Sequence, residues 1–338
     1  MFNKVLIRKS NLINNIKQVK LENPNSKICA MVKANAYGVG VNEVVQIIDD
    51  YVDFYGVACF FEANKLKNLT NKKILIVGPL QKGEINTSFS YTCSSLGDIE
   101  YLISQNKEIN VHLKINTGMN RYGFKDLKTF KKAINLILTS KLHIEGVFTH
   151  YATTDDYVRT QTQIFNKYIK LVKSFKINPI IHADNSFVNE KFNHGYNMVR
   201  IGFSLYNRSD GWYLPAVEIK SEVVQTQEVK KNELVGYDYR FVAKNNTKIA
   251  IVPIGYADGF DMKYIGIDLI VKGKKCKVLN ICMDCFMLDI TNTDIKKGDE
   301  IYILNKFNTL KLYADYNLTS QYETMIKFSF IRAERVIV

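Results

Sequence analysis

Short apolar runs alternate with longer stretches of helical spacing over about the first 205 residues. This alternation is typical of strands that are each followed by a helix, and such units build a parallel sheet. Residues 126–138 and 161–172 carry apolar side chains at helical spacing, and Ser10 and Ser95 stand where N-caps are expected. We predict eight strands, at residues 27–33, 54–59, 73–77, 89–93, 109–115, 144–149, 179–183 and 198–201.

Eight strand and helix units predict an α/β fold of the TIM (β/α)8 barrel type over residues 1–212. A doubly wound sheet fits the same alternation if one of the strands is absent. After about residue 213 the texture changes to strand-like runs, with helical stretches nearly absent. We therefore predict a second, mainly antiparallel β domain over residues 213–338, in which a turn at Gly273 closes a hairpin.

Composition narrows the class of protein. The chain has 338 residues, of which 46% are hydrophobic, so it can bury a large core. It shows no apolar stretch long enough for a signal peptide or a membrane span, and we expect a cytoplasmic protein. The net charge of +13 comes from dispersed lysines, which do not form the footprint of a nucleic-acid-binding surface.

The six cysteines are scattered, so a disulfide framework is not expected. Cys282 and Cys285 form a C-x-x-C pattern, but a zinc site would require further cysteine or histidine ligands at close spacing. We predict no metal, while redox use of this pair stays an alternative.

Candidate chemistry follows from the predicted barrel. In TIM barrels the reacting groups lie just after the carboxyl ends of the strands. That rule selects Lys33, Lys114, His150, Ser186 and Gly202. A lysine that is desolvated at a strand end has a lowered pKa, which favours Schiff-base chemistry.

Short motifs support this selection. In chain order they are VKANAYG (residues 32–38), KINTGMNR (114–121), TH (149–150), NS (185–186), VRIG (199–202), VGY (235–237), IGYADG (254–259) and CMD (282–284). In type and order these motifs resemble those of the alanine racemase family, along nearly the whole chain. The family's architecture, a barrel followed by a β domain, agrees with the pattern-based prediction.

The resemblance implies pyridoxal 5'-phosphate (PLP) as the cofactor, bound as a Schiff base to Lys33. It further implies that the phosphate is held by the hydroxyls of Tyr37 and Ser186, by Gly202 and by the amide of Phe203. The usual phosphate site of a barrel follows strands 7 and 8, where Ser186 and Gly202 lie.

The resemblance also assigns the proton chemistry. Racemisation removes a proton from one face of the α-carbon and returns one to the other, and the implied bases are Lys33 and Tyr237. A tyrosine is a poor base at neutral pH, so His150, with Arg200 behind it, is the implied relay. Arg200 is implied to face the pyridine nitrogen of PLP. In the family the tyrosine comes from a second subunit, which implies a homodimer.

Substrate contacts follow in the same way. Arg121 is implied to bind the substrate carboxylate, and Lys114 matches a lysine that is carbamylated in many relatives and orients that arginine. Tyr256 and the amide of Met283 are expected around the substrate. A small amino acid is thus the expected partner, with no nucleic acid and no membrane.

Three positions depart from the family pattern. Phe330 stands where a pocket tyrosine is usual, so that a hydroxyl is missing there and either lower activity or a different substrate side chain is expected. Asn116 replaces a frequent aspartate, and Asp238 follows Tyr237 where glycine is common.

We therefore predict an isomerase that interconverts L- and D-alanine and supplies D-alanine for peptidoglycan. The alternatives are a racemase for serine or for several small amino acids, and a non-catalytic PLP-binding protein. Taken singly, each site residue also has an ordinary structural explanation, such as a helix cap for Ser186 or a buried, hydrogen-bonded histidine for His150.

Overall fold

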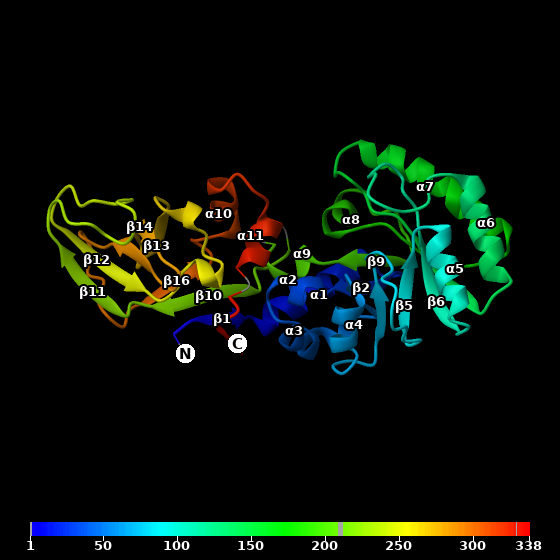
Figure 1. The fold of residues 1–338 in the computed structure, drawn as a ribbon, viewed down its shortest axis with the longest axis horizontal. Helices are drawn as coiled ribbons and strands as arrows, with labels where there is room; N and C mark the ends of the chain where they lie inside the picture. The colour runs from blue at the N-terminus through cyan, green and yellow to red at the C-terminus, as the bar shows by residue number, and fades with distance from the viewer. Residues whose placement is uncertain (1, 209–211, 329) are drawn as a thin grey trace. The chain divides into compact units, whose positions relative to one another are not determined.

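The computed structural model describes residues 2–208, 212–328 and 330–338. It divides into two compact units, each of which is described by itself. The barrel unit comprises Ile13–Ala36 and Val44–Leu205, and the β unit comprises Met1–Leu12, Tyr37–Glu43 and Tyr206–Val338. Figure 1 shows the helices and strands of both.

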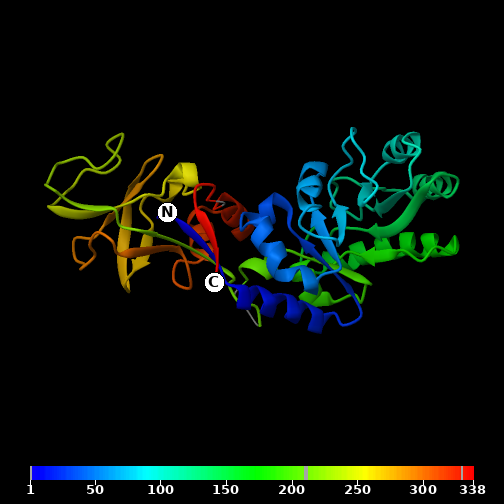
Figure 2. The same ribbon diagram turned by 90° about the horizontal axis from the view of Figure 1, so that it is seen from below.

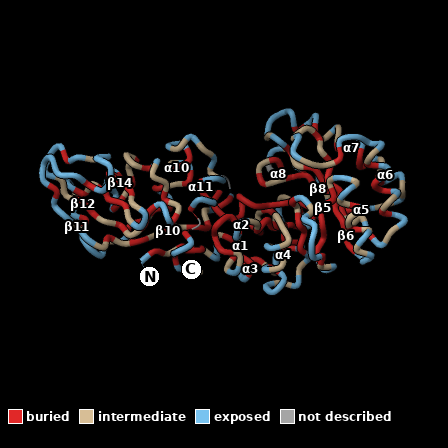
Figure 3. Tube along the Cα trace, in the orientation of Figure 1, coloured by how far each residue is buried: buried red, intermediate tan, exposed pale blue. Residues whose placement is uncertain are grey.

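The core of the barrel unit is a sheet of eight parallel strands in the order β8-β7-β6-β5-β4-β3-β2-β9. Most residues of these strands are buried, as Figure 3 shows and as expected for strands covered on both faces. They are β2 (Lys27–Met31), β3 (Phe54–Val57), β4 (Lys73–Ile76), β5 (Phe89–Cys93), β6 (Ile109–Lys114), β7 (Leu142–Phe148), β8 (Ile180–His182) and β9 (Met198–Ile201).

The barrel is nearly closed. The two end strands, β8 and β9, share no ladder, but the amide of Arg200 donates to the carbonyl of Asp184 at 3.1 Å. The amide of Ile181 also donates to the side chain of Asn197 at 2.5 Å. The prediction of a barrel is therefore correct, and each of the eight predicted strands overlaps one of its strands.

Helices follow the strands in the chain, and Figure 1 shows α4 to α7 on the outside of the sheet. Ser95 caps α5 through a bond from the amide of Asp98, as predicted, and Asp126 caps α6. The helices of this part of the chain are α1 (Lys9–Glu22), α2 (Lys33–Tyr37), α3 (Val41–Ile48), η1 (Asp49–Tyr51), α4 (Phe60–Leu66), α5 (Leu96–Ser104), α6 (Leu127–Leu138), α7 (Tyr157–Ser174), α8 (Ser186–Phe192) and α9 (Phe203–Tyr206).

The β unit contains a four-stranded sheet, β16-β10-β1-β17, and a five-stranded sheet, β11-β12-β15-β14-β13. The hairpin of β13 and β14 turns at Gly273, as predicted. The strands are β1 (Lys4–Ile7), β10 (Val217–Glu222), β11 (Gln225–Val229), β12 (Thr247–Val252), β13 (Asp268–Val271), β14 (Lys274–Ile281), β15 (Phe286–Asp289), β16 (Glu300–Leu304) and β17 (Glu334–Ile337).

All pairs in these two sheets are antiparallel except β1 with β17, which run parallel. The first strand of the chain therefore belongs to the β unit, beside the last strand. Both termini accordingly lie near each other in Figures 1 and 2. The prediction placed one domain boundary, at residue 212. The compact units are instead made of several segments each, because residues 1–12 and 37–43 group with the C-terminal part of the chain, and the boundary stays a prediction.

Two expectations were wrong. Ser10 is not an N-cap but the second residue of α1, because the helix begins directly after β1 and the amide of Lys9 bonds to the carbonyl of Val338. The region after residue 213 also contains helices, namely η2 (Tyr256–Asp258), η3 (Met262–Tyr264), α10 (Leu310–Tyr316) and α11 (Gln321–Lys327). None of the helices that the structure describes is long and apolar enough to cross a membrane.

Candidate active site

The barrel strands bring four basic side chains to one end. Lys33 follows β2, Lys114 ends β6, His150 follows β7 and Arg200 lies in β9. The carboxyl ends of parallel strands meet at the same edge of a barrel. Burial is the largest cause that lowers the pKa of Lys33, Lys114 and His150, and the positive charge of Arg200 lowers each of these pKa values further. The structure thus places these predicted residues in one electrostatic neighbourhood.

The backbone after Lys33 is unusual. Residues 34–37 all lie in the left-handed region, with φ between 52° and 58°, so α2 is a left-handed turn. Such a conformation costs an ordinary residue about 1–2 kcal/mol. A carboxylate helps to hold the turn, because Glu62 accepts the amides of Ala34 and Ala58, each at 2.7 Å. Strain of this kind marks positions that the surrounding structure over-determines.

The ammonium group of Lys33 is destabilised where it lies. Burial lowers the pKa of Lys33 most, and the charges of Arg121 and Arg200 lower it further, while Glu62 opposes them. A lysine with a lowered pKa has a larger fraction of the nucleophilic neutral amine at neutral pH. The lowered pKa of Lys33 therefore agrees with the predicted covalent attachment.

Arg200 is buried, and three acceptors lie within 3.0 Å of its guanidinium. Its Nη2 donates to the carbonyl oxygens of Thr149 at 2.8 Å and Ala183 at 2.9 Å, and its Nη1 donates to Nδ1 of His182 at 2.6 Å. Burial lowers the pKa of Arg200 to about 10, so the guanidinium stays protonated at neutral pH. A protonated guanidinium can only donate hydrogen bonds.

His150 lies beside this arginine, with its Nδ1 3.5 Å from Nη2 of Arg200. Burial, followed by the charges of Arg200 and Arg121, lowers the pKa of His150 to about 3. The imidazole is therefore neutral at neutral pH. Because Nδ1 faces a donor, the ring proton is on Nε2.

Lys114 is buried against an aromatic ring. Its Nζ lies 3.5 Å from the centroid of Tyr122, and the guanidinium of Arg121 lies 5.3 Å from the same centroid. Burial and the charges of Arg121 and Arg200 lower the pKa of Lys114 to about 7. The loop between them is held by Asn116, whose Oδ1 accepts the amides at positions 118 and 120. An amide oxygen therefore serves where the family often has a carboxylate.

The candidate phosphate site groups backbone amides around one hydroxyl. Oγ of Ser186 lies 3.2 Å from the amide of Gly202 and 3.4 Å from that of Ser204. The alternative that Ser186 caps α8 is wrong, because Asn185 is the N-cap and accepts two amides of the helix. Phe203, the fourth predicted residue here, begins α9.

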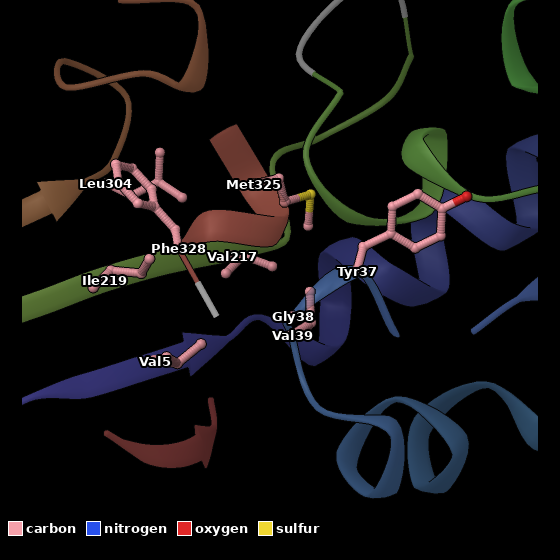
Figure 4. Close-up of a pocket in the computed structure, with 9 residues that line it drawn as sticks. All are labelled: Val5, Tyr37, Gly38, Val39, Val217, Ile219, Leu304, Met325 and Phe328. Carbon is pink, nitrogen blue, oxygen red and sulfur yellow. The ribbon is translucent and has the colours of Figure 1, made fainter. Parts of the chain in front are cut away.

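Tyr37 ends the left-handed turn and lies in the β unit. Its ring packs against Tyr206 and Tyr322, with centroids 5.3 and 6.4 Å away. Figure 4 shows Tyr37 together with Met325 and Phe328 at a small apolar cavity of this unit. These aromatic contacts fix the position of the ring.

The β unit carries the remaining predicted residues. Tyr256 begins η2, and its amide donates to the carbonyl of Cys282 at 3.1 Å, so it adjoins the loop of Met283. Arg332 ties the two segments together, because its guanidinium pairs with Asp258 of η2 and Asp284 of the loop. The side chains of Tyr256 and Met283 are 43% and 52% exposed.

Tyr237 lies on an exposed loop of the β unit and is itself 68% exposed. Nδ2 of the buried Asn280 donates to the carbonyl oxygens of Val235 and Tyr237, at 2.8 and 3.1 Å. Asp238 has a φ of 60°, the left-handed value that glycine adopts without strain. The aspartate therefore keeps the backbone conformation expected of a glycine at this position.

Phe330 is fully buried and packs against Phe328 with centroids 5.6 Å apart. Its backbone is left-handed, with a φ of 40°. A phenyl ring cannot make the hydrogen bonds of a tyrosine hydroxyl. The departure from the family pattern is therefore a buried apolar contact.

Three polar residues inside the barrel were not predicted. His112 of β6, Glu145 of β7 and His182 of β8 form a hydrogen-bonded chain that ends on Arg200. His112 lies two positions before Lys114, and residues two apart share one face of a strand. The two-residue repeat of a strand was therefore a signal in the sequence that could have identified His112.

Within the described residues, all six cysteines are free, and no cluster of His, Cys, Asp or Glu is arranged to hold a metal ion. Cys282 and Cys285 instead flank the turn that carries Met283, where the amide of Cys282 donates to the carbonyl of Cys285 at 2.7 Å.

Two family models match nearly the whole chain. Alanine racemase, N-terminal domain, matches residues 7–210, and alanine racemase, C-terminal domain, matches residues 216–337. The chain belongs to the alanine racemase family. The alanine racemase of Fusobacterium nucleatum is 32% identical over an alignment 321 positions long, which covers 88% of this chain and 90% of that protein.

Solved structures of alanine racemases share the fold. The enzyme of Bacillus anthracis with bound L-Ala-P superposes with a TM-score of 0.92 at 26% identity, covering 100% of this chain and 95% of that one. The enzyme of Bartonella henselae with covalently bound pyridoxal phosphate gives a TM-score of 0.86 at 22% identity, with 100% of both chains covered. Together these matches confirm the predicted alanine racemase family, fold class and isomerase class.

Proposed function

We propose that this protein interconverts L- and D-alanine with PLP bound through Lys33. The predicted activity and cofactor are those of the alanine racemase family, so both are confirmed at the level of the family. The residue assignment rests on one observation, namely that Lys33 and Arg200 lie at the same end of the barrel. There the pKa of Lys33 is lowered by burial and by positively charged neighbours.

The donor set fits the cofactor. An anionic phosphate requires hydroxyls and amides, which Ser186, Gly202 and Phe203 supply together with the hydroxyl of Tyr37. Arg200 offers a fixed donor for the pyridine nitrogen. When bound, PLP withdraws electrons from the α-carbon of an amino acid and so makes its proton easier to remove.

Racemisation then requires one group to remove this proton and another to deliver a proton to the opposite face of the α-carbon. With PLP bound, Nζ of Lys33 would take or give the proton at one face of the α-carbon, and the phenolic oxygen of Tyr237 would do so at the other. His150, neutral with its proton on Nε2, and Arg200 behind it support the tyrosine. Because Arg200 can only donate, it would hold a pyridine nitrogen placed against it in the unprotonated form, which would restrain electron withdrawal.

The substrate carboxylate is assigned to Arg121, whose fixed guanidinium suits an anion. Lys114 orients this arginine after carbamylation, which requires the neutral amine that a pKa of about 7 provides. On the family resemblance we also assign Tyr256 and the amide of Met283 to substrate binding. The second candidate is a racemase of serine or of several small amino acids, because Phe330 lacks the hydroxyl of the family's usual pocket tyrosine.

We assign Tyr237 to the active site of a second subunit, which makes the enzyme a homodimer. Exposed apolar side chains surround it on the β unit, including Tyr239 at 81%, Leu234 at 44% and Val242 at 39% exposed. Aromatic side chains of this kind are enriched in interfaces. We also propose that the enzyme works in the cytoplasm and supplies D-alanine for peptidoglycan.

A mixing experiment tests the bases and the dimer together. The Lys33→Ala and Tyr237→Phe variants should each be almost inactive, and only the second should show the absorbance of PLP attached to a lysine. After the two are mixed, unfolded and refolded together, half of the dimers are hybrids, and each hybrid has one intact site. Activity should therefore return to about a quarter of the wild-type value.

A wild-type protein that binds no PLP would refute the proposed function. Recovery of no activity in the mixture, with hybrids present by mass spectrometry, would refute the assignment of Tyr237 to the partner's site. The matched control is Tyr239→Phe, an exposed neighbour that should keep full activity.

A further inference from the structure

A hydrogen-bonded chain of four side chains runs through the interior of the barrel. Nη1 of Arg200 lies 2.6 Å from Nδ1 of His182, and Nε2 of His182 lies 2.8 Å from Nδ1 of His112. Nε2 of His112 lies 3.1 Å from a carboxylate oxygen of Glu145. Both imidazoles are fully buried, and the side chain of Glu145 is 9% exposed.

Every link has one possible direction. Arg200 can only donate, so Nδ1 of His182 accepts and the proton of this ring is on Nε2. That proton is donated to Nδ1 of His112, whose own proton is then on Nε2 and is donated to the carboxylate of Glu145. Both histidines are therefore neutral in the same tautomer, and the chain joins a buried cation to a carboxylate.

The ionisation of the groups agrees with this direction. Burial, against the pull of Glu145, lowers the pKa of His112, and burial with Arg200 lowers that of His182 well below its ordinary value. Burial alone would raise the pKa of Glu145, but hydrogen bonds from His112, Lys73 and Ser90 lower it to about 2. Lys73 pairs with the other carboxylate oxygen, and its side chain is 57% exposed.

An irregularity in the pairing of β6 with β7 positions the residues of this hydrogen-bonded chain. In the register of β6 with β7, Val111 faces Ile144 and His112 faces Gly146, so Glu145 is an extra residue in a β-bulge. Bulges re-aim side chains. A Cβ on Gly146 would lie 2.1 Å from Nδ1 of His112, so the imidazole occupies space that only glycine leaves free.

We propose that Glu145 is the remote counter-ion of Arg200, and that His112 and His182 are positioning residues which transmit its charge to the cofactor end of the barrel. The proposal rests on the proposed function in that Arg200 faces PLP. Four positively charged side chains lie at that end of the barrel, namely Lys33, Lys114, Arg121 and Arg200. The carboxylate of Glu145, linked to Arg200 by aligned hydrogen bonds, lowers the positive electrostatic potential there. A lower positive potential limits electron withdrawal through the ring nitrogen.

Charge-changing variants of the PLP-bound enzyme test this. Glu145→Gln keeps an acceptor for His112 but removes the negative charge. The pH midpoint of the cofactor absorbance should fall by about half a unit, because a more positive site disfavours protonation. Lys73→Met removes the opposing charge and should raise the midpoint. Loss of packing alone would not give opposite signs.

The matched control is Glu108→Gln, an exposed carboxylate just before β6, which should leave the midpoint unchanged. His182→Asn should act like Glu145→Gln, because its side-chain oxygen can still accept from Arg200 while the link to His112 is cut. An unchanged midpoint in folded Glu145→Gln and His182→Asn enzymes would overturn the proposal.

A second readout does not depend on catalysis. In 15N NMR of the histidine rings, His112 and His182 should both be neutral, with the proton on Nε2, from pH 6 to 9. Finding a proton on Nδ1 of either ring, or a charged ring at pH 7, would also overturn it. Should the wild-type protein bind no PLP, the proposed function fails, while the tautomers still report on the hydrogen-bonded chain.

Discussion

At the scale of single residues, the site is marked by an excess of positive charge. Lys33, Lys114, Arg121 and Arg200 each enter the electrostatics of another member of the group, and the pKa of both lysines is lowered. Neutral amines are good nucleophiles toward aldehydes and carbon dioxide alike. A carbamate on Lys114 would turn one of these positive charges into a negative one and so relieve the crowding.

We therefore predict that Lys114 is carbamylated when bicarbonate is present. With 13C-labelled bicarbonate at pH 8, the protein should give one carbamate signal in its 13C NMR spectrum, because most of an amine with a pKa of about 7 is neutral at that pH. The signal should be absent from Lys114→Met. A wild-type spectrum with no such signal would contradict the prediction.

The sequence could predict the residues that end strands, because a barrel places strand ends together whatever their spacing in the chain. It could not show that Asn185 and not Ser186 is the N-cap of α8, since asparagine and serine are both good N-cap residues. The sequence analysis did not predict His112 and Glu145, for a different reason. The histidine required a face assignment within β6, and the carboxylate points inward only because of an irregular register that no periodic pattern reveals.

At the scale of elements, the bulge in β7 decides how the barrel interior is filled. We predict that Gly146→Ala lowers the free energy of unfolding by about 2 kcal/mol, because the added methyl group overlaps His112 and forces it to move. Urea denaturation followed by circular dichroism measures this.

Gly97→Ala is the control for this substitution. Gly97 lies in α5, and the nearest atom to its Cβ would be Oγ of Ser95 at 3.8 Å. Alanine should therefore be neutral or raise the free energy of unfolding by about 0.5–1 kcal/mol. Equal losses in both variants would show that the contact with His112 is not the cause.

The pattern of apolar runs predicted all eight barrel strands but missed β1, β17, α10 and α11. Strand β17 has no buried residue, and β1 comes before the first of the strand and helix units from which the barrel was predicted. Helices α10 and α11 have seven residues each. Their N-caps, Thr309 and Ser320, were nevertheless a usable signal, because Ser320 is followed at the third position by Glu323.

At the scale of the whole molecule, buried histidines make folding sensitive to acid. His112 and His182 have lowered pKa values in the folded state, so between about pH 6.5 and those values only the unfolded chain binds the protons. Stability therefore falls as the pH is lowered below about 6.5, by up to about 1.4 kcal/mol per pH unit for each proton. Below pH 4.5, Glu145 adds a change of the same sign.

Thermal unfolding between pH 7.5 and 5 measures this dependence. His182→Asn should have a smaller slope, since one buried imidazole is gone, whereas His143→Gln should keep the wild-type slope because His143 is exposed. Identical slopes for His182→Asn and the wild type would contradict the prediction.

The pairing of β1 with β17 has a consequence for biosynthesis. Strand β1 is translated before its partners, because it pairs in parallel with β17, which begins at Glu334, and in antiparallel with β10, which begins at Val217. The strands of the barrel, by contrast, are all translated by Ile201. Because domains generally fold as units during synthesis, the barrel can form on the nascent chain before β10 and β17, the partners of β1, have been translated.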